Sequence, residues 1–308
     1  MKTWPVTSPF PASEARDDVR RAAQTAAQSA TGEPRALQWL LILLAVALVG
    51  LILVVPLFIV FSQAFSQGWT LYRASLVDPN ALAAIKLTLL VALIVVPINT
   101  VFGIAAAWAI TRFRFKGKGT LLTLIDLPFA VSPVISGLVF VLLFGRRGLL
   151  GPWLEAHDWK IIFALPGIIL ATLFVTFPFV ARQLIAFMES QGAEEEEAAV
   201  TLGANGFQTF WRVTLPNIKW SLLTGVILCT ARAMGEFGAV SVVSGGVNGQ
   251  TNTLPLQVEL LYNGSGETDY AAAFALSSLL TFFGLFTLAI KSILEWKAAR
   301  QLKEGSSN

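Results

Sequence analysis

Six stretches of this sequence are too long and too apolar to be the surface of a water-soluble domain. They cover residues 36–61, 82–110, 121–144, 161–181, 220–243 and 271–290. A helix crosses a hydrocarbon core of about 30 Å with about 20 apolar residues. The apolar residues show no period of two, which favours helices over barrel strands. We therefore predict an all-α polytopic membrane protein with six transmembrane helices. Composition agrees, because only 13% of the 308 residues are charged, against about 25% in soluble domains.

The distribution of positive charge predicts the orientation of these spans. With the N-terminus inside, the inner segments contain sixteen Lys and Arg residues and the outer segments four. The positive-inside rule then places both termini and the 182–219 loop in the cytoplasm. The predicted organisation is a disordered tail over 1–35, a six-helix membrane domain over 36–294 and a second cytoplasmic tail over 295–308. The formal charge of +3 is too small to suggest a nucleic-acid partner.

Residues for catalysis or metal binding are scarce. The chain has one cysteine, Cys229, and one histidine, His157, so it offers neither a disulfide nor a Cys/His metal spacing. It also lacks a phosphate-binding loop of the form G-x-x-x-x-G-K-[ST]. An intramembrane enzyme would need grouped reactive residues, but the candidate carboxylates Asp126 and Glu236 are on different spans. We expect a chain that is not catalytic by itself and binds no cofactor or metal.

Several of the predicted spans contain proline, which removes a backbone donor and kinks a helix. These residues are Pro56, Pro97, Pro128, Pro133, Pro166 and Pro178. They are compatible with flexible joints in a moving transporter and equally with ordinary membrane-helix proline, because neighbouring helices can satisfy the freed carbonyl groups.

Residues 194–216, "EEEEAAVTLGANGFQTFWRVTLP", are the most polar part of the predicted cytoplasmic loop and contain most of its turn signals. Four carboxylates complement the positive end of a helix dipole, which predicts a helix over 194–202. Gly203 can adopt the left-handed conformation that ends a helix. Asn205-Gly206 indicates a second turn, and Pro216 suits the first turn of the next span.

Phe207, Phe210 and Trp211 then recur at spacings of three and four, which predicts a second short helix with an aromatic stripe. The two short helices are too small to form a core of their own. We expect the aromatic stripe to pack inward on the membrane helices. We expect the Ala and Gly face of the first helix to dock on a partner.

The spacing within this segment resembles the EAA motif of bacterial ABC importer permeases. "EAA" at 197–199 is followed after three residues by Gly203, after nine more by Val213, and after one more by Leu215-Pro216. Valine replaces the usual isoleucine. The resemblance implies a type I ABC importer permease fold, with ATP and Mg bound by a separate ATPase subunit. It further implies that this ATPase couples to the chain through Glu197, Ala198, Ala199, Gly203, Leu215 and Pro216.

The fifth predicted span carries charge at membrane depth. Arg232 and Glu236 are four residues apart and can pair on one helix face. Charged residues at such depth face protein or water rather than lipid. The pair could be a structural ion pair, or Arg232 could offer a transient counter-charge to an anion. Gly235 and Gly238 allow close helix approach, and Ser241 and Ser244 follow as further candidates to line a translocation pathway.

The strings "TARAMGEFGAVSVVSGG" (230–246) and "GQTNTLPLQVELLYN" (249–263) resemble the CysW-type subunits of sulfate/thiosulfate ABC importers. This resemblance implies a bacterial inner-membrane complex. Its other members would be a second, T-type permease, an ATP-binding subunit dimer and a periplasmic sulfate/thiosulfate-binding protein. A molybdate or tungstate permease is one alternative. An ATP-independent anion transporter is another, although the two halves show no convincing inverted repeat.

Overall fold

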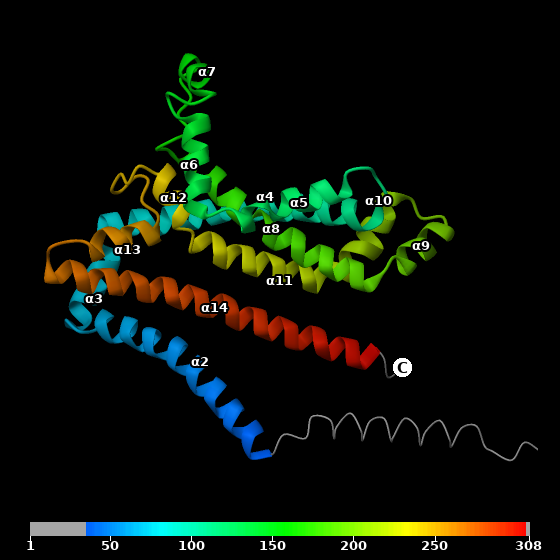
Figure 1. Cartoon of the computed structure of the whole chain (residues 1–308), viewed down its shortest axis with the longest axis horizontal. Coiled ribbons are helices and arrows are strands. Elements are labelled where there is room, and N and C mark those ends of the chain that lie inside the picture. Colours follow the sequence, from blue (N-terminus) through cyan, green and yellow to red (C-terminus); the bar gives the residue numbers. More distant parts are fainter. Residues whose placement is uncertain (1–34, 306–308) are drawn as a thin grey trace, which may run out of the picture. The chain divides into compact units, whose positions relative to one another are not determined.

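The computed structural model describes residues 35–305, with side chains over 36–297, and every regular element in that range is helical. The helices are α2 (Arg35–Ala64), α3 (Gly68–Val77), α4 (Pro79–Arg112), α5 (Lys118–Ala130), α6 (Pro133–Phe144), α7 (Gly151–Ala156), α8 (Leu165–Gln191), α9 (Glu194–Thr201), α10 (Gly206–Thr209), the π-helical turn η1 (Phe210–Thr214), α11 (Leu215–Met234), α12 (Gly238–Val243), α13 (Leu254–Tyr262) and α14 (Glu267–Gly305). Figure 1 shows their order along the chain.

The chain divides into two compact units, one ending at Phe58 and the other beginning at Ile59. The first unit contributes most of α2, whose residues 36–64 include an 18-residue window with a mean hydropathy of 3.2 and form the first predicted span. The tail predicted over 1–35 lies outside the described residues, except for Arg35, where α2 begins. The remaining elements belong to the second unit.

Within residues 35–305, five helical segments are long and apolar enough to cross a membrane. They are Ala36–Ala64, Pro79–Arg112, Leu165–Gln191, Gly206–Met234 and Glu267–Lys297. The third predicted span, 121–144, is not one continuous helix, because α5 and α6 meet at a bend of 107°. Counting this bent pair as one span gives the six spans expected from the sequence.

The bend between α5 and α6 has a local cause. A residue before proline is disfavoured in the helical conformation, and Ser132, which precedes Pro133, has ψ of 135°. Val131 is extended as well. In Figure 1, α6 accordingly leaves the direction of the long helices. Pro133 therefore starts a new helix instead of kinking an existing one.

The boundaries of three other spans also differ from those expected. The fourth span, expected over 161–181, forms α8 and extends to Gln191. The fifth, expected over 220–243, ends at Met234, and Gly238–Val243 forms the separate helix α12. The sixth continues as α14 to Gly305, so the described part of the 295–308 tail is helical.

The prolines divide into two structural groups. Pro56, Pro97, Pro128 and Pro178 lie inside continuous helices, whereas Pro133 and Pro166 lie in first turns. Proline is tolerated in a first turn because the N–H group there has no helical partner. Pro133 alone among the six coincides with the 107° bend.

The core of the second unit lies between α4, α8 and α11. Gly103 of α4 allows close contact, since a Cβ atom there would lie 2.7 Å from Val180 Cγ1. The buried Asn99 Nδ2 donates to Thr176 Oγ1 at 2.7 Å and joins α4 to α8. Small residues and interhelical hydrogen bonds are the usual means of association inside membranes. This core holds α9 and α10 at one end of the long helices and α13 at the other (Figure 1).

Candidate functional site

The first short helix of the 194–216 segment forms much as predicted. α9 spans Glu194–Thr201, with all four glutamates in its first turn. Gly203 has φ of +91°, the left-handed conformation that favours glycine. The N–H groups of Leu202 and Ala204 then donate to the carbonyl groups of Ala198 and Ala199, both at 3.0 Å. Gly203 therefore closes the end of α9.

Asn205 starts the second short helix through a capping box. Its side chain accepts from the N–H group of Gln208, and the Gln208 side chain accepts in return from the Asn205 N–H group. The expected turn at Asn205-Gly206 is thus a helix start. The chain continues without a break through η1 into α11, where Leu215 and Pro216 form the first turn.

Glu196 joins this segment to the membrane helices, and the sequence analysis did not single it out. Its Oε1 accepts from Arg112 Nη2 at 3.0 Å and Nε at 3.1 Å, and from Thr214 Oγ1 at 3.1 Å. The side chains of Arg112 and Glu196 are only 11% and 14% exposed. Glu196 therefore ties α9 both to the end of α4 and to η1. Its position within a run of four glutamates gave no way to distinguish it from its neighbours.

The outer surface of the segment is apolar, and the expectation for its aromatic residues was partly wrong. Phe210 does pack inward, with its ring 5.1 Å from that of Trp108. Phe207 and Trp211, however, are 73% and 53% exposed, because they lie on a face of this helical segment that is turned away from α4. Leu202 is 88% exposed.

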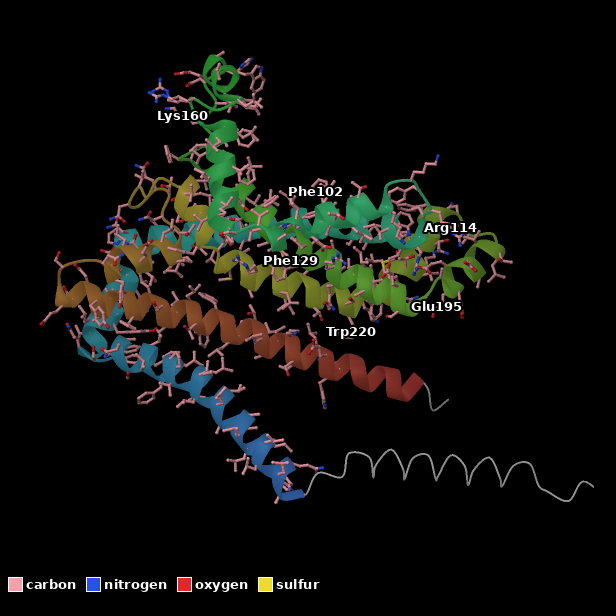
Figure 2. All side chains as sticks on the ribbon, viewed as in Figure 1. Phe102, Arg114, Phe129, Lys160, Glu195 and Trp220 are labelled. Atoms are coloured by element: carbon pink, nitrogen blue, oxygen red, sulfur yellow. The ribbon has the colours of Figure 1, made fainter. Side chains whose placement is uncertain are left out.

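We define the coupling patch as the exposed Ala198, Val200, Leu202, Phe207 and Trp211. Glu197 is exposed beside it, and Ala199 is half-buried. Figure 2 labels the nearby Glu195, whose carboxylate accepts from the Asn217 side chain. The rings of Phe207 and Trp211 lie 6.0 Å apart, and exposed apolar side chains beside polar ones are typical of a protein interaction site.

Arg232 and Glu236 do pair, but not on one helix face as the spacing predicted. α11 ends at Met234, and Glu236 lies in the break before α12. Glu236 Oε1 accepts from the Ala239 N–H group at 2.8 Å, which caps α12. Its Oε2 lies 2.5 Å from Arg232 Nη1, a charge contact without hydrogen-bond alignment. Glu236 is fully buried, whereas the Arg232 side chain is 31% exposed.

The small residues near this pair have separate roles. A Cβ atom at Gly238 would lie 2.9 Å from Pro133 Cβ, so Gly238 permits close approach of α12 to α6. A Cβ atom at Gly235, where α11 ends, would contact only the Ala231 carbonyl of the same helix. Ser241 Oγ donates to the Gly238 carbonyl and Ser244 Oγ accepts from the Gly246 N–H group. Both hydroxyl groups therefore bond within their own segment.

The other residues that the sequence suggested as reactive also have defined positions. Asp126 of α5 pairs with Arg182 of α8, so each candidate carboxylate within the spans has its own arginine. Cys229 is buried, and His157 is an exposed residue beside Trp153. Among the described residues no three His, Cys, Asp or Glu side chains form a metal-binding group.

Replacing Arg232 with methionine is expected to lower the melting temperature of the detergent-purified complex, because the buried Glu236 carboxylate would lose its counter-charge. Removing one member of a buried ion pair costs about 3–5 kcal/mol. The double variant Arg232→Met/Glu236→Gln should recover most of this loss and retain transport, since glutamine can still cap α12. A double variant that is stable but inactive would instead support an anion-contacting role for Arg232.

Comparisons with known proteins agree with this geometry. Residues 99–300 match the family described as "Binding-protein-dependent transport system inner membrane component". The chain is 52% identical over 268 residues to the sulfate transport system permease protein CysW of Escherichia coli K12, covering 86% of this chain and 90% of that protein. It is 57% identical over 254 residues to CysW of Synechococcus elongatus, covering 82% and 87%. Identity to the E. coli K12 permease CysT is 37% over 254 residues, covering 82% and 91%.

Solved structures show the same fold at low sequence identity. A chain of the crystal structure of a bacterial ABC transporter involved in import of the acidic polysaccharide alginate matches with a TM-score of 0.66 and 18% identity. The match covers 86% of this chain and 96% of that chain. A second crystal structure, of a bacterial alginate ABC transporter in complex with a pentasaccharide-bound periplasmic protein, gives a TM-score of 0.60. It is also 18% identical, and it covers 92% of this chain and 96% of its own.

Proposed function

Since this chain belongs to the family of binding-protein-dependent transport system inner membrane components, we propose that it is the permease of an ATP-driven importer for sulfate or thiosulfate. The chain is a multi-pass membrane permease and not itself an enzyme. The high identity to sulfate permeases across most of the chain supports the substrate class. The molybdate or tungstate alternative is not favoured.

The proposed complex contains a second permease of the T-type, two ATP-binding subunits and a periplasmic sulfate/thiosulfate-binding protein. ATP and Mg bind to the ATPase subunits. The complex lies in the bacterial inner membrane with both termini of this chain in the cytoplasm. The segment over 244–270, which includes α13 and the start of α14, contains no Lys or Arg and carries Glu259, Glu267 and Asp269. Such a segment would not attract a free anion, which supports delivery of sulfate by a binding protein.

The observation that carries the coupling mechanism is the construction of the 194–216 segment. Its coupling patch is exposed, while Glu196 fixes its inner side to Arg112 and Thr214. A partner that binds the patch can therefore move α4 and α11 together. We propose that ATP closes the two ATPase subunits and switches the membrane cavity from inward-facing to outward-facing. Sulfate enters from the binding protein, and hydrolysis resets the assembly.

Glu197, Ala198, Ala199 and Gly203 are the proposed contact and hinge residues of this coupling, and Leu215 and Pro216 transmit its motion into α11. The translocation pathway is proposed to pass near Arg232, Gly235, Gly238, Ser241 and Ser244. Arg232 is already paired with Glu236, whereas a selective anion pore would present unpaired basic groups. Substrate selection is therefore assigned chiefly to the binding protein.

The proposal is tested by labelled sulfate uptake in a strain that lacks this chain, with and without a plasmid copy. The plasmid should restore uptake, thiosulfate should compete, and a tenfold excess of molybdate should not. Restored uptake that molybdate blocks as efficiently as unlabelled sulfate would reassign the substrate to molybdate. No restoration would contradict the proposed function.

A further inference from the structure

The helix α6 presents an apolar stripe that the other described helices of the second unit do not cover. Ile135, Leu138, Val139 and Leu142 are 55%, 49%, 53% and 64% exposed. Their spacing of three, four and seven residues places them on one face of the helix. The stripe therefore needs an apolar environment from outside the second unit.

The opposite face of α6 is fixed by close packing, so the orientation of the stripe is well defined. A Cβ atom at Gly137 would lie 2.6 Å from the Ala239 carbonyl of α12. The ring of Phe140 lies 5.9 Å from that of Phe174 of α8. Ser136 is buried on the same side. These contacts hold α6 against α8 and α12, and Figure 1 shows it leaving the line of the long helices.

Lipid is a poor environment for the start of this helix. α5 has 13 residues, so the break at Val131-Ser132 lies about 20 Å from its cytoplasmic end, inside a core of about 30 Å. Ala130 and Ser132 are exposed at the break, and the first turn of α6 has no side-chain cap. Irregular backbone at membrane depth is tolerated only where it faces protein or a water-filled cavity.

Water alone does not suit the same surface. The four stripe residues carry no polar side-chain atom, and burying apolar area is worth about 25 cal/mol per Å². A protein surface satisfies both requirements, because it can cover the stripe and contact the exposed residues Ala130 and Ser132 at the break. The cover must itself lie in the membrane, since the break lies at membrane depth.

We propose that the α6 stripe and the adjoining break at 130–132 form the contact with the second, T-type permease of the complex. This inference rests on the proposed function, which supplies the partner. A different chain is favoured over a second copy because E. coli K12 contains relatives of two types, CysW and CysT, in its sulfate transport system. α6 would then lie at the contact between the two permeases, beside the break between α11 and α12.

Photocrosslinking in the assembled complex tests this contact. A benzophenone amino acid is placed at Leu138, at Leu142 one turn later, and at Leu288 of α14 as a control, since Leu288 is 55% exposed. Adducts in membranes that express all subunits are identified by mass spectrometry. The expected result is crosslinking to the T-type permease at Leu138 and Leu142, at least about fivefold above Leu288. Co-purification of the ATPase confirms that each variant is assembled.

Equal yields at all three positions, lipid adducts alone, or adducts with the ATPase, the same chain or a second copy would overturn the assignment. Sulfate uptake by the unmodified complex is measured in parallel. Normal uptake without the expected adduct would refute the contact and leave the function standing. The expected adduct without sulfate uptake would refute the function and leave the contact standing.

Discussion

The variant Gly203→Asp is expected to abolish ATP-driven uptake, to below about a tenth of the wild-type rate, while the chain stays in the membrane. Gly203 has φ of +91°, and nothing lies within 4 Å of where a Cβ atom would be. A new carboxylate therefore enters the exposed side of the turn, beside the coupling patch. Placing a residue with a side chain in the left-handed backbone conformation also costs about 1–2 kcal/mol. Uptake and membrane content are measured on the same cells.

Gly117→Asp is the matched control for this experiment. Gly117 is also left-handed, with φ of +99°, also has nothing within 4 Å, and precedes α5 outside the 194–216 segment. Its variant shares the backbone strain and the added charge, and it should keep uptake within about twofold of wild type. Comparable loss in both variants would mean that strain alone explains the result, and wild-type uptake by Gly203→Asp would refute the role of the turn.

The variant Glu196→Ala is expected to lower uptake about tenfold or more. It removes the acceptor for Arg112 and Thr214 and leaves an arginine side chain that is only 11% exposed without its partner. Truncating one member of a buried hydrogen-bonded charge pair costs about 2–5 kcal/mol. α9 should then move without transmitting force to α4. The ATPase activity of the purified complex and its sulfate uptake are measured together, because uncoupling reduces uptake more than hydrolysis.

Two further variants isolate the role of this ion pair. Glu194→Ala removes a glutamate from the same helix turn, but Glu194 is exposed, so uptake should change little. Exchanging the charges in Arg112→Glu/Glu196→Arg should restore part of the uptake lost by either single change. Equal losses in Glu194→Ala and Glu196→Ala would show that the total charge of α9 matters and that the specific contact does not.

Local sequence signals were sufficient for the spans and for the construction of the coupling segment. Apolar length determines which stretches can cross a membrane, and the conformation of Gly203 depends on its immediate neighbours. The predictions of the spans and of the turn at Gly203 are confirmed because each rests on interactions within a few residues. The coupling role and the ATPase partner came from the resemblance to the EAA motif and stay predictions.

Contacts between distant segments could not be predicted in the same way. Arg112 and Glu196 are 84 residues apart in sequence, and nothing in either neighbourhood indicates the other. The prolines indicated irregular helices, but the same residue type starts a new helix at Pro133 and lies inside the continuous helix α4 at Pro97. The break at 235–237 likewise depends on Glu236 capping α12 instead of continuing α11.

ATP dependence of transport in a reconstituted system tests the central claim most directly. Proteoliposomes containing this chain, the T-type permease and the ATPase are supplied with the binding protein and labelled sulfate on one side and with ATP and Mg on the other. We predict sulfate accumulation that requires ATP, Mg and the binding protein and that persists when ion gradients are dissipated. Accumulation driven by an ion gradient without ATP would contradict the account.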